Sequence, residues 1–109
     1  MAYDENLAFR VKTILGNLPG LMEKKMFGGI GYLLNGNMAC GIHKEYLIVR
    51  VGPDQHQSAL EKPHARVFDI TGRPMTGWVM VAPDGFIDQA ALVNWVQMGL
   101  DFAATLPQK

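Results

Sequence analysis

Residues 30–42, with the sequence IGYLLNGNMACGI, decide the fold. Asn35 and Gly36 stand between two apolar runs, and an asparagine–glycine pair is the strongest short-range signal for a two-residue hairpin turn. The runs on either side, Ile30–Leu34 and Met38–Ile42, have the length of ordinary strands. The segment therefore predicts two antiparallel strands joined by a type I′ turn.

The same hydrophobic period of two continues on both sides of this hairpin. It predicts a strand at Met22–Phe27 before the hairpin and another at Tyr46–Val51 after it. Lys44-Glu45 is expected to form the tight turn that leads into the last of these strands. Four consecutive strands joined by short turns predict an antiparallel meander.

Helical periodicity replaces the strand pattern at both ends of the chain. Apolar residues between Asp4 and Leu18 predict a helix with Asp4 as its N-cap, ended by Gly16-Asn17 with Pro19-Gly20 beyond. Its apolar face comprises Leu7, Val11, Ile14, Leu15 and Leu18. The last helix begins at Asp88, and Ile87 is expected to pack on Leu92 as a hydrophobic staple. Its apolar face comprises Leu92, Trp95, Val96, Gly99, Phe102, Ala103 and Leu106.

The segment between these regions predicts a short helix and two more strands. The helix is expected over residues 54–62 with Asp54 as its N-cap, and the strands at Arg66–Ile70 and Gly77–Val81. The whole order predicts an α+β domain spanning residues 1–109, in two layers, with an antiparallel sheet of about six strands and helices packed on one face.

Composition limits the class of protein. The 109 residues include ten Lys plus Arg and ten Asp plus Glu, so the net charge is zero. A zero balance disfavours a dedicated nucleic-acid binder and predicts easy self-association. The N-terminus lacks the pattern of a signal peptide, and no apolar run is long enough to span a membrane. We therefore expect a cytoplasmic protein without a membrane contact.

Both faces of the predicted sheet are apolar in places. In the strand at Tyr46–Val51, Leu47 and Val49 lie on one face, while Tyr46, Ile48 and Arg50 lie on the other. An uncovered apolar face favours a homodimer or a contact with a partner protein. The alternative is that one of the helices, or the loop carrying Thr71–Met75, covers it.

Cations and aromatic residues supply the candidate binding site. Lys25, Arg50 and Arg73 are candidates for a groove that binds a small anion, a nucleic acid or an acidic partner, with Tyr46 and Trp78 as aromatic neighbours. Tyr32 is a further stacking candidate, and Lys24 is expected on the face opposite Lys25. Pro74 restricts the backbone at Arg73 and so orients its side chain. The alternative is structural: Arg50 and Arg73 pair with carboxylates such as Glu23 or Asp69.

Catalytic and metal sites have weaker support in the sequence. Cys40 and His43 are three residues apart and point to opposite faces of a strand, and His56 and His64 lack the spacing of a zinc site. Cys40 lies in an apolar strand, where a buried and unreactive thiol is expected. A dyad of His64 and Asp69 has no nucleophile beside it in sequence. We expect no catalytic residue, no metal and no cofactor.

Several short motifs, in order along the chain, resemble the N-terminal domain of the TfoX/Sxy family of bacterial competence regulators. They are Tyr3-Asp4-Glu5, Lys24-Lys25-Met26-Phe27-Gly28-Gly29, Asn35-Gly36-Asn37-Met38, Leu47-Ile48-Val49-Arg50-Val51-Gly52, and Thr71-Gly72-Arg73-Pro74-Met75 with Trp78. The resemblance implies a compact, secretion-chaperone-like α+β fold. Because the sequence ends at Lys109, we expect a stand-alone form without the second domain of full-length regulators.

The resemblance supplies no agreed catalytic residues. It therefore favours a non-enzymatic regulatory or protein-interaction module, acting on an unidentified protein partner and forming a homodimer through its sheet or last helix. The alternative is a binding module for a small anionic ligand or nucleic acid, centred on Lys25, Arg50 and Arg73.

Overall fold

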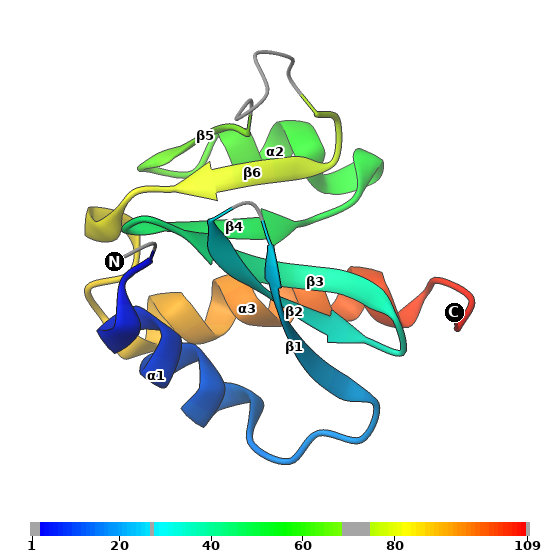
Figure 1. Ribbon diagram of the computed structural model, residues 1–109. Coiled ribbons are helices and arrows are strands. Elements are labelled where there is room, and N and C mark those ends of the chain that lie inside the picture. Colours follow the sequence, from blue (N-terminus) through cyan, green and yellow to red (C-terminus); the bar gives the residue numbers. More distant parts are fainter. Residues whose placement is uncertain (1–2, 27, 69–74, 109) are drawn as a thin grey trace.

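The computed structural model describes residues 3–26, 28–68 and 75–108 of the 109-residue chain. These residues form an α+β domain whose sheet has six strands (Figure 1). The helices are α1 (Glu5–Leu15), α2 (His56–Leu60) and α3 (Gln89–Ala104), with short 3-10 helices η1 (Pro53–Gln55) and η2 (Pro83–Gly85). The strands are β1 (Leu21–Met26), β2 (Gly29–Leu34), β3 (Asn37–His43), β4 (Tyr46–Arg50), β5 (Ala65–Val67) and β6 (Trp78–Val81).

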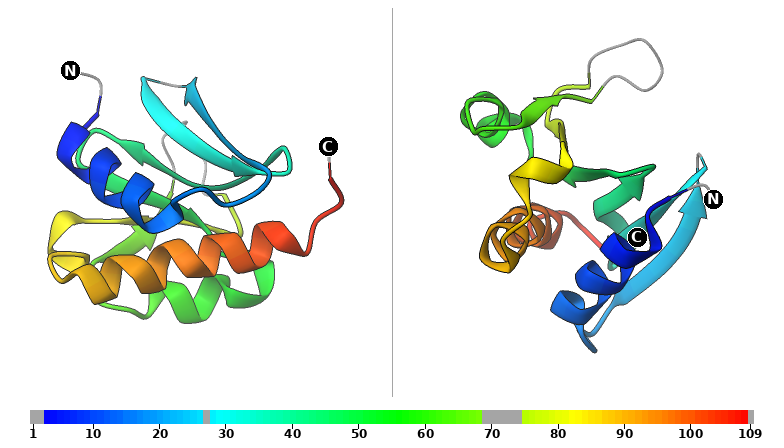
Figure 2. Two further views of the ribbon diagram at one scale, coloured as in Figure 1. Left: turned by 90° about the horizontal axis from the view of Figure 1, so that it is seen from below. Right: turned by 90° about the vertical axis from the view of Figure 1, so that its left-hand side faces the viewer.

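The strands follow the order β1-β2-β3-β4-β6-β5, and every neighbouring pair is antiparallel. The first four strands are the meander that the sequence predicts. The chain then passes through α2 to β5 at the edge, and β6 returns between β5 and β4. All three α-helices lie on one side of this sheet (Figure 2). The predicted two-layer architecture is therefore confirmed, and the alternative that a helix covers the second face is wrong.

The turn between β2 and β3 has the geometry that its asparagine and glycine predict. Asn35 and Gly36 have φ values of 53° and 86°, and the flanking residues Leu34 and Asn37 are paired. Two consecutive residues with positive φ are the mark of a type I′ turn, whose twist matches that of the strands. Lys44, in the turn between β3 and β4, also has a positive φ of 56°.

A bulge in β3 brings the sheet close to α3. The register between β2 and β3 shifts, so that Ala39 is an extra residue on β3. A Cβ atom at Gly99 of α3 would lie 3.0 Å from the carbonyl carbon of Ala39 and closer still to its oxygen. Glycine at this position therefore lets the backbone of the helix approach the backbone of the sheet.

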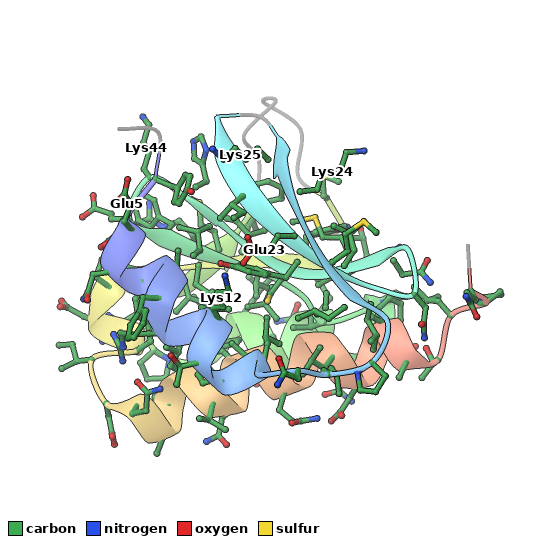
Figure 3. All side chains as sticks on the ribbon, turned by 60° about the horizontal axis from the view of Figure 1, so that its bottom comes forward. Glu5, Lys12, Glu23, Lys24, Lys25 and Lys44 are labelled. Carbon is green, nitrogen blue, oxygen red and sulfur yellow. The ribbon has the colours of Figure 1, made fainter. Side chains whose placement is uncertain are left out.

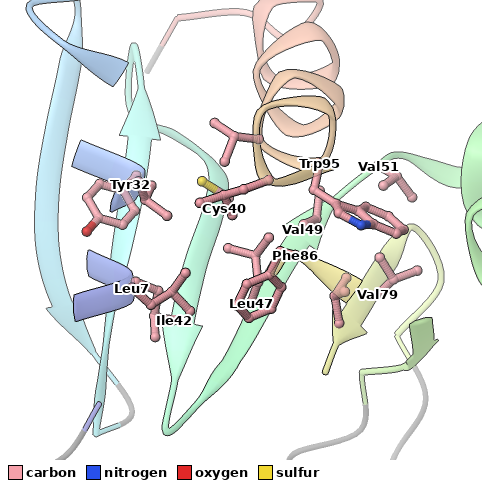
Figure 4. Close-up of a cluster of buried hydrophobic side chains, with 14 of the residues drawn as sticks. Leu7, Tyr32, Cys40, Ile42, Leu47, Val49, Val51, Val79, Phe86 and Trp95 are labelled. Atoms are coloured by element: carbon pink, nitrogen blue, oxygen red, sulfur yellow. The ribbon is translucent and has the colours of Figure 1, made fainter. Parts of the chain in front are cut away.

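The core lies between the sheet and the helices (Figure 4). Alternate strand residues such as Cys40, Leu47 and Val49 are fully buried, and Leu7 and Trp95 reach them from α1 and α3. Burying one such side chain contributes roughly 1.5–3 kcal/mol. The apolar period of two that the sequence shows on this face is therefore the main source of stability.

Both long helices begin with an aspartate cap, as predicted. The carboxylate of Asp4 accepts hydrogen bonds from the backbone N–H groups of Asn6 at 2.9 Å and Leu7 at 3.1 Å. The carboxylate of Asp88 accepts one from the N–H of Ala90 at 3.2 Å. These bonds satisfy N–H groups that the first turn of a helix leaves without partners.

The predicted hydrophobic staple is wrong, because Ile87 is 74% exposed. The preceding residue, Phe86, is buried in the core instead. Arg10 of α1 fixes this arrangement: its guanidinium lies 6.0 Å from the centre of the Phe86 ring and donates a 2.7 Å hydrogen bond to the Phe86 carbonyl. These contacts of Arg10 hold the loop so that the Phe86 side chain points into the core and the Ile87 side chain points into solvent.

The short helix also differs from its prediction. Asp54 lies inside η1 and makes no side-chain cap, while α2 proper is only five residues long. Pro53 at the first position of η1 favours this tight 3-10 turn. The sequence predicts a strand at Arg66–Ile70, and the structure has β5 at Ala65–Val67. The last two residues of the predicted strand, Asp69 and Ile70, lie outside the described ranges. Within those ranges, no helix has the length and apolar character needed to cross a membrane.

Candidate functional site

The sheet face opposite the helices is the candidate site, and we call it the open face. Strand register places these described side chains on it: Met22, Lys24, Leu33, Met38, His43, Tyr46, Ile48, Arg50, Arg66, Trp78 and Met80. Met22 is 64% exposed at the β1 edge, whereas Ile48 in the middle is only 3% exposed. None of the helices that the structure describes packs against this face (Figure 2). It is therefore a mostly apolar surface with a close-packed centre and accessible margins.

Arg50 and three aromatic rings form one end of the open face. The Arg50 guanidinium carbon lies 5.2 Å from the centre of the Trp78 ring and 5.4 Å from that of Phe102. Phe68 extends the cluster, with its ring centre 6.1 Å from that of Trp78. A guanidinium lying over a ring face keeps its N–H groups at its edge, where a carboxylate or phosphate binds.

Gly52 explains why Phe102 can join this cluster. It has a φ of 87°, and a Cβ atom there would run into the Phe102 ring. The N–H groups of Val51 and Gly52 both donate to the carbonyl of Gly77, at 2.8 and 3.0 Å, which fixes the end of β4. Glycine thus lets the last turn of α3 place its ring beside Arg50.

A second arginine–aromatic pair lies at the other end of β4. Arg66 of β5 reaches across β6, so that its guanidinium carbon lies 5.3 Å from the centre of the Tyr46 ring. Tyr46 and Arg50 are the first and last residues of β4. The two stacked guanidinium groups therefore mark the two ends of one strand, with the apolar side chains of Ile48 and Met80 between them.

Charges are segregated between the two sides of the domain. The described strand residues on the open face include the cations Lys24, Arg50 and Arg66 and no carboxylate. On the helix side, residues 3–20, 52–64 and 82–108 carry seven carboxylates and three cations, Arg10, Lys12 and Lys62. The seven are Asp4, Glu5, Asp54, Glu61, Asp84, Asp88 and Asp101. A net charge of zero thus conceals one cationic and one acidic side.

Two hollows lie on the acidic side, on either side of Met98 and Asp101 of α3. One has a volume of about 650 Å³ and is bounded by η1 and the last turns of α3, including Phe102. The other has a volume of about 570 Å³ and lies between α3, η2 and the loop that carries His64. Asp54 lines the first hollow and Asp84 the second. Neither hollow contains Arg50 among its lining residues.

The structure brings together only part of the predicted cationic groove. Arg50, Tyr46 and Trp78 share the open face. Lys25 lies on the opposite face, paired with Ile30, so it does not form a groove with Arg50. Figure 3 shows Lys24 and Lys25 pointing in opposite directions, and Lys24 is the one on the open face. Arg73 lies outside the described residues, as does the loop segment 69–74.

The structure also bears on the suggested carboxylate partners of the arginines and on the suggested stacking role of Tyr32. Glu23 lies 3.7 Å from the ammonium of Lys12 on α1, so it is not the partner of Arg50 (Figure 3). Asp69, the other suggested partner, is outside the described residues, and so is any dyad of Asp69 with His64. Tyr32 faces the helices, is 1% exposed and donates a 3.4 Å hydrogen bond to the carbonyl of Ala8. It is therefore a core residue and not a stacking platform.

The surroundings of Cys40, His43 and His56 point to structural and not to catalytic roles. Burial raises the pKa of the Cys40 thiol from 9.0 to about 12, so the thiol stays protonated at neutral pH. His43 points to the other face, as the strand alternation predicts. The Nδ1 atom of His56 accepts a 2.8 Å hydrogen bond from the N–H of Gly77. Among the described residues, no group of three His, Cys, Asp or Glu side chains has metal-binding geometry.

Sequence reasoning missed Arg66, Phe68 and Phe102 as members of the site. Arg66 alternates with Ala65 and Val67 in β5, but its place on the open face follows only from the pairing of β5 with β6. The sequence pattern places Phe102 on the apolar face of the last helix, and no feature of the neighbouring sequence indicates that its ring reaches Arg50. These contacts depend on how distant elements meet.

The fold defines an α+β domain in which the described helices cover one side of an antiparallel sheet and leave the other side without a helix. Comparison with protein-family models matches residues 13–103 to the TfoX N-terminal domain. The match covers most of the chain, so this protein belongs to the TfoX N-terminal domain family, as the sequence motifs indicate. No curated protein and no solved structure matched the chain in the same comparisons.

Proposed function

We propose that this chain is a non-enzymatic interaction module, of the competence-regulator type, that binds a partner protein through its open face. One observation supports this most directly: the helices cover one face of the sheet only, and the other carries accessible methionine, aromatic and arginine side chains. Large apolar surfaces that the fold itself does not cover are typical of interaction sites. Flexible methionines such as Met22 and Met80 suit a surface that adapts to its partner.

A second candidate function is the binding of a nucleic acid or a small anion on the same face. The stacking of Arg50 on Trp78 favours it, because bases and phosphates bind to such pairs. Only three cations lie among the described side chains of this face, and they form no continuous track for a phosphate backbone. A protein partner therefore has the stronger support.

The partner in this proposal is a different protein. A symmetric contact between two open faces would bring together two surfaces whose described strand residues carry the cations Lys24, Arg50 and Arg66 and no carboxylate. Like charges that meet across an interface disfavour the contact. The homodimer expected from the sequence stays a prediction, and in this proposal it uses another surface.

The test uses two exposed apolar residues on opposite sides of the domain. Met22 on the open face is 64% exposed, and Val93 on α3 is 38% exposed, so neither Met22→Gln nor Val93→Gln alters the core. A photo-cross-linking amino acid at position 22 or at position 94 is used to capture partners, which are identified, purified and titrated against each variant. We expect capture from position 22 and weaker binding of the Met22→Gln variant alone. Equal binding by both variants would refute the use of the open face.

A further inference from the structure

We propose that the partner of the open face is an acidic, extended peptide segment, in which two carboxylates four residues apart bind Arg50 and Arg66. This inference rests on the proposed function and names the chemistry of the partner. The described strand residues of the open face carry cations and no carboxylate, whereas the helix side carries an excess of carboxylates, so the open face favours a negatively charged ligand.

The two guanidinium groups are suited to carboxylates. Each lies over an aromatic ring, Arg50 over Trp78 and Arg66 over Tyr46, at 5.2 and 5.3 Å from the ring centres. Stacking orders the arginine side chain before the ligand binds, so less rotamer entropy is lost on binding. It also leaves the N–H donors at the edge of the guanidinium plane accessible to a ligand. A bidentate contact with a carboxylate uses those donors.

Their separation sets the spacing of the acids in the ligand. Arg50 stacks on its cross-strand neighbour Trp78, at the last residue of β4, while Arg66 stacks on Tyr46, at the first. Four residues of extended chain span about 13 Å. An extended peptide laid along β4 matches this span when its acids are at positions one and five, because positions one, three and five point to the same side.

The residue between the two acids meets an apolar surface. Ile48 and Met80 are paired across β4 and β6, midway between the arginine–aromatic pairs. Met38 borders this centre, because its methyl group lies against Gly41, the neighbour of Ile48 on β3. An apolar side chain at position three of the ligand therefore contacts the thioethers of Met38 and Met80, since Ile48 itself is only 3% exposed. The pattern expected is acid, any residue, apolar residue, any residue, acid.

Other occupants fit the charges less well. A second copy presented face to face repeats the same three cations. Single-stranded nucleic acid would use the aromatic rings, but its many phosphates require more cations than this face has. Both are outcomes that the experiment distinguishes.

The experiment is a titration of the complete ¹⁵N-labelled chain, followed by two-dimensional NMR. The first probe is a peptide containing glutamate-serine-leucine-serine-glutamate. The second has the same composition with the two glutamates adjacent, and the third has glutamine in place of glutamate. The fourth probe is a twelve-nucleotide oligothymidylate, and unlabelled protein serves as the fifth. We expect the first peptide to shift amide signals of β4, β5 and β6, and to bind more tightly than the other four probes.

The variants are chosen so that their effects can be separated from unfolding. Arg50→Gln and Arg66→Gln should each weaken binding of the first peptide about tenfold, the loss expected for one hydrogen-bonded charge pair. Lys62→Gln is the matched control, since Lys62 also lies over an aromatic ring, 6.0 Å from the centre of Trp95, but on the helix side. It should leave binding unchanged. Dispersed spectra and an unchanged melting temperature show that each variant is folded.

Several results would overturn the inference. If the glutamine peptide binds as tightly as the first peptide, the carboxylates do not contribute to binding. The same conclusion follows if the Arg50→Gln/Arg66→Gln double variant binds the first peptide as tightly as the parent protein does. Equal binding of the peptide with adjacent glutamates would remove the spacing. Tighter binding of oligothymidylate would identify a nucleic-acid surface, and shifts caused by unlabelled protein a self-association surface. If a purified partner protein binds in a manner that needs Met22 but not the two arginines, the proposed function stands and this inference fails.

Discussion

The substitution Gly99→Ala tests the close contact between α3 and the bulge in β3. Two effects oppose each other at this position. Alanine is a better helix former than glycine by about 1 kcal/mol, so propensity alone predicts stabilisation. The added methyl group, however, would lie 3.0 Å from the carbonyl carbon of Ala39, closer to its oxygen, and 3.5 Å from a methyl group of Val49.

We expect the steric cost of the added methyl group to exceed the gain in helix propensity. The obstacle is a main-chain carbonyl held in the sheet, which cannot rotate away as a side chain would. The helix must therefore move outward and loosen contacts that bury Trp95 and Ala103. Overpacking of this kind costs about 1–3 kcal/mol or more where the neighbour is rigid. Because the obstacle is backbone, we take the upper end of this range, about 3 kcal/mol; after the gain in propensity of about 1 kcal/mol, we expect a net loss of about 2 kcal/mol, or about 10 °C in melting temperature for a chain of this size.

The assay is urea unfolding followed by the fluorescence of the two tryptophans. The matched control is Asn94, an exposed residue on the same helix. The difference between Asn94→Ala and Asn94→Gly measures the helix propensity alone, and it should favour alanine by about 1 kcal/mol. If Gly99→Ala is as stable as the parent protein, or gains the same amount as the control pair, the close approach of α3 to the sheet is incorrect.

Four further predictions follow from the core, the caps and the surface. Cys40 should not react with a thiol reagent in the native state at pH 8, and its labelling rate should equal the rate of global unfolding; fast labelling would contradict its burial. Because the pKa of this thiol is raised to about 12, the unfolded chain loses its proton first as the pH rises above 9, so stability should fall there by at most about 1.4 kcal/mol per pH unit. The fall should be shallower in Cys40→Ala, and an equal slope would exclude this cause. Asp88→Ala should lower the free energy of unfolding by about 1 kcal/mol through loss of the helix cap, whereas Asp101→Ala, near the other end of α3, should not show this cap effect. Light scattering at two concentrations tests the homodimer, which a monomeric mass at several hundred micromolar would refute.

Local signals predicted most of the fold. The turn at Asn35 and Gly36 needs only two residues whose backbones tolerate positive φ, and the caps at Asp4 and Asp88 need only one side chain each. Strand alternation likewise predicted that Lys24 and Lys25 point to opposite faces. These features depend on neighbours in the sequence, which is why the sequence shows them.

The composition of the site depended on tertiary contacts that no local pattern contains. Alternation separates Lys24 from Lys25, but only the pairing of Lys24 with Gly31 shows which of them shares a face with Arg50. Phe102 reaches Arg50 because the end of α3 passes over Gly52. The staple failed for the same reason, since the guanidinium of Arg10, distant in sequence, turns Phe86 inward in place of Ile87.

The zero net charge is the point at which composition and structure lead to different conclusions. A binding partner responds to the charges within about one Debye length, roughly 8 Å at physiological ionic strength. The domain measures 31 × 30 × 28 Å, so carboxylates more than a Debye length from the open face are largely screened from a partner there, although Asp54 and Asp101 line the same hollow as Phe102, whose ring lies beside Arg50. A partner on the open face meets Lys24, Arg50 and Arg66 as a local excess of positive charge. The balanced composition therefore argues against a strongly basic protein, but not against a cationic surface that is specific for a short acidic segment.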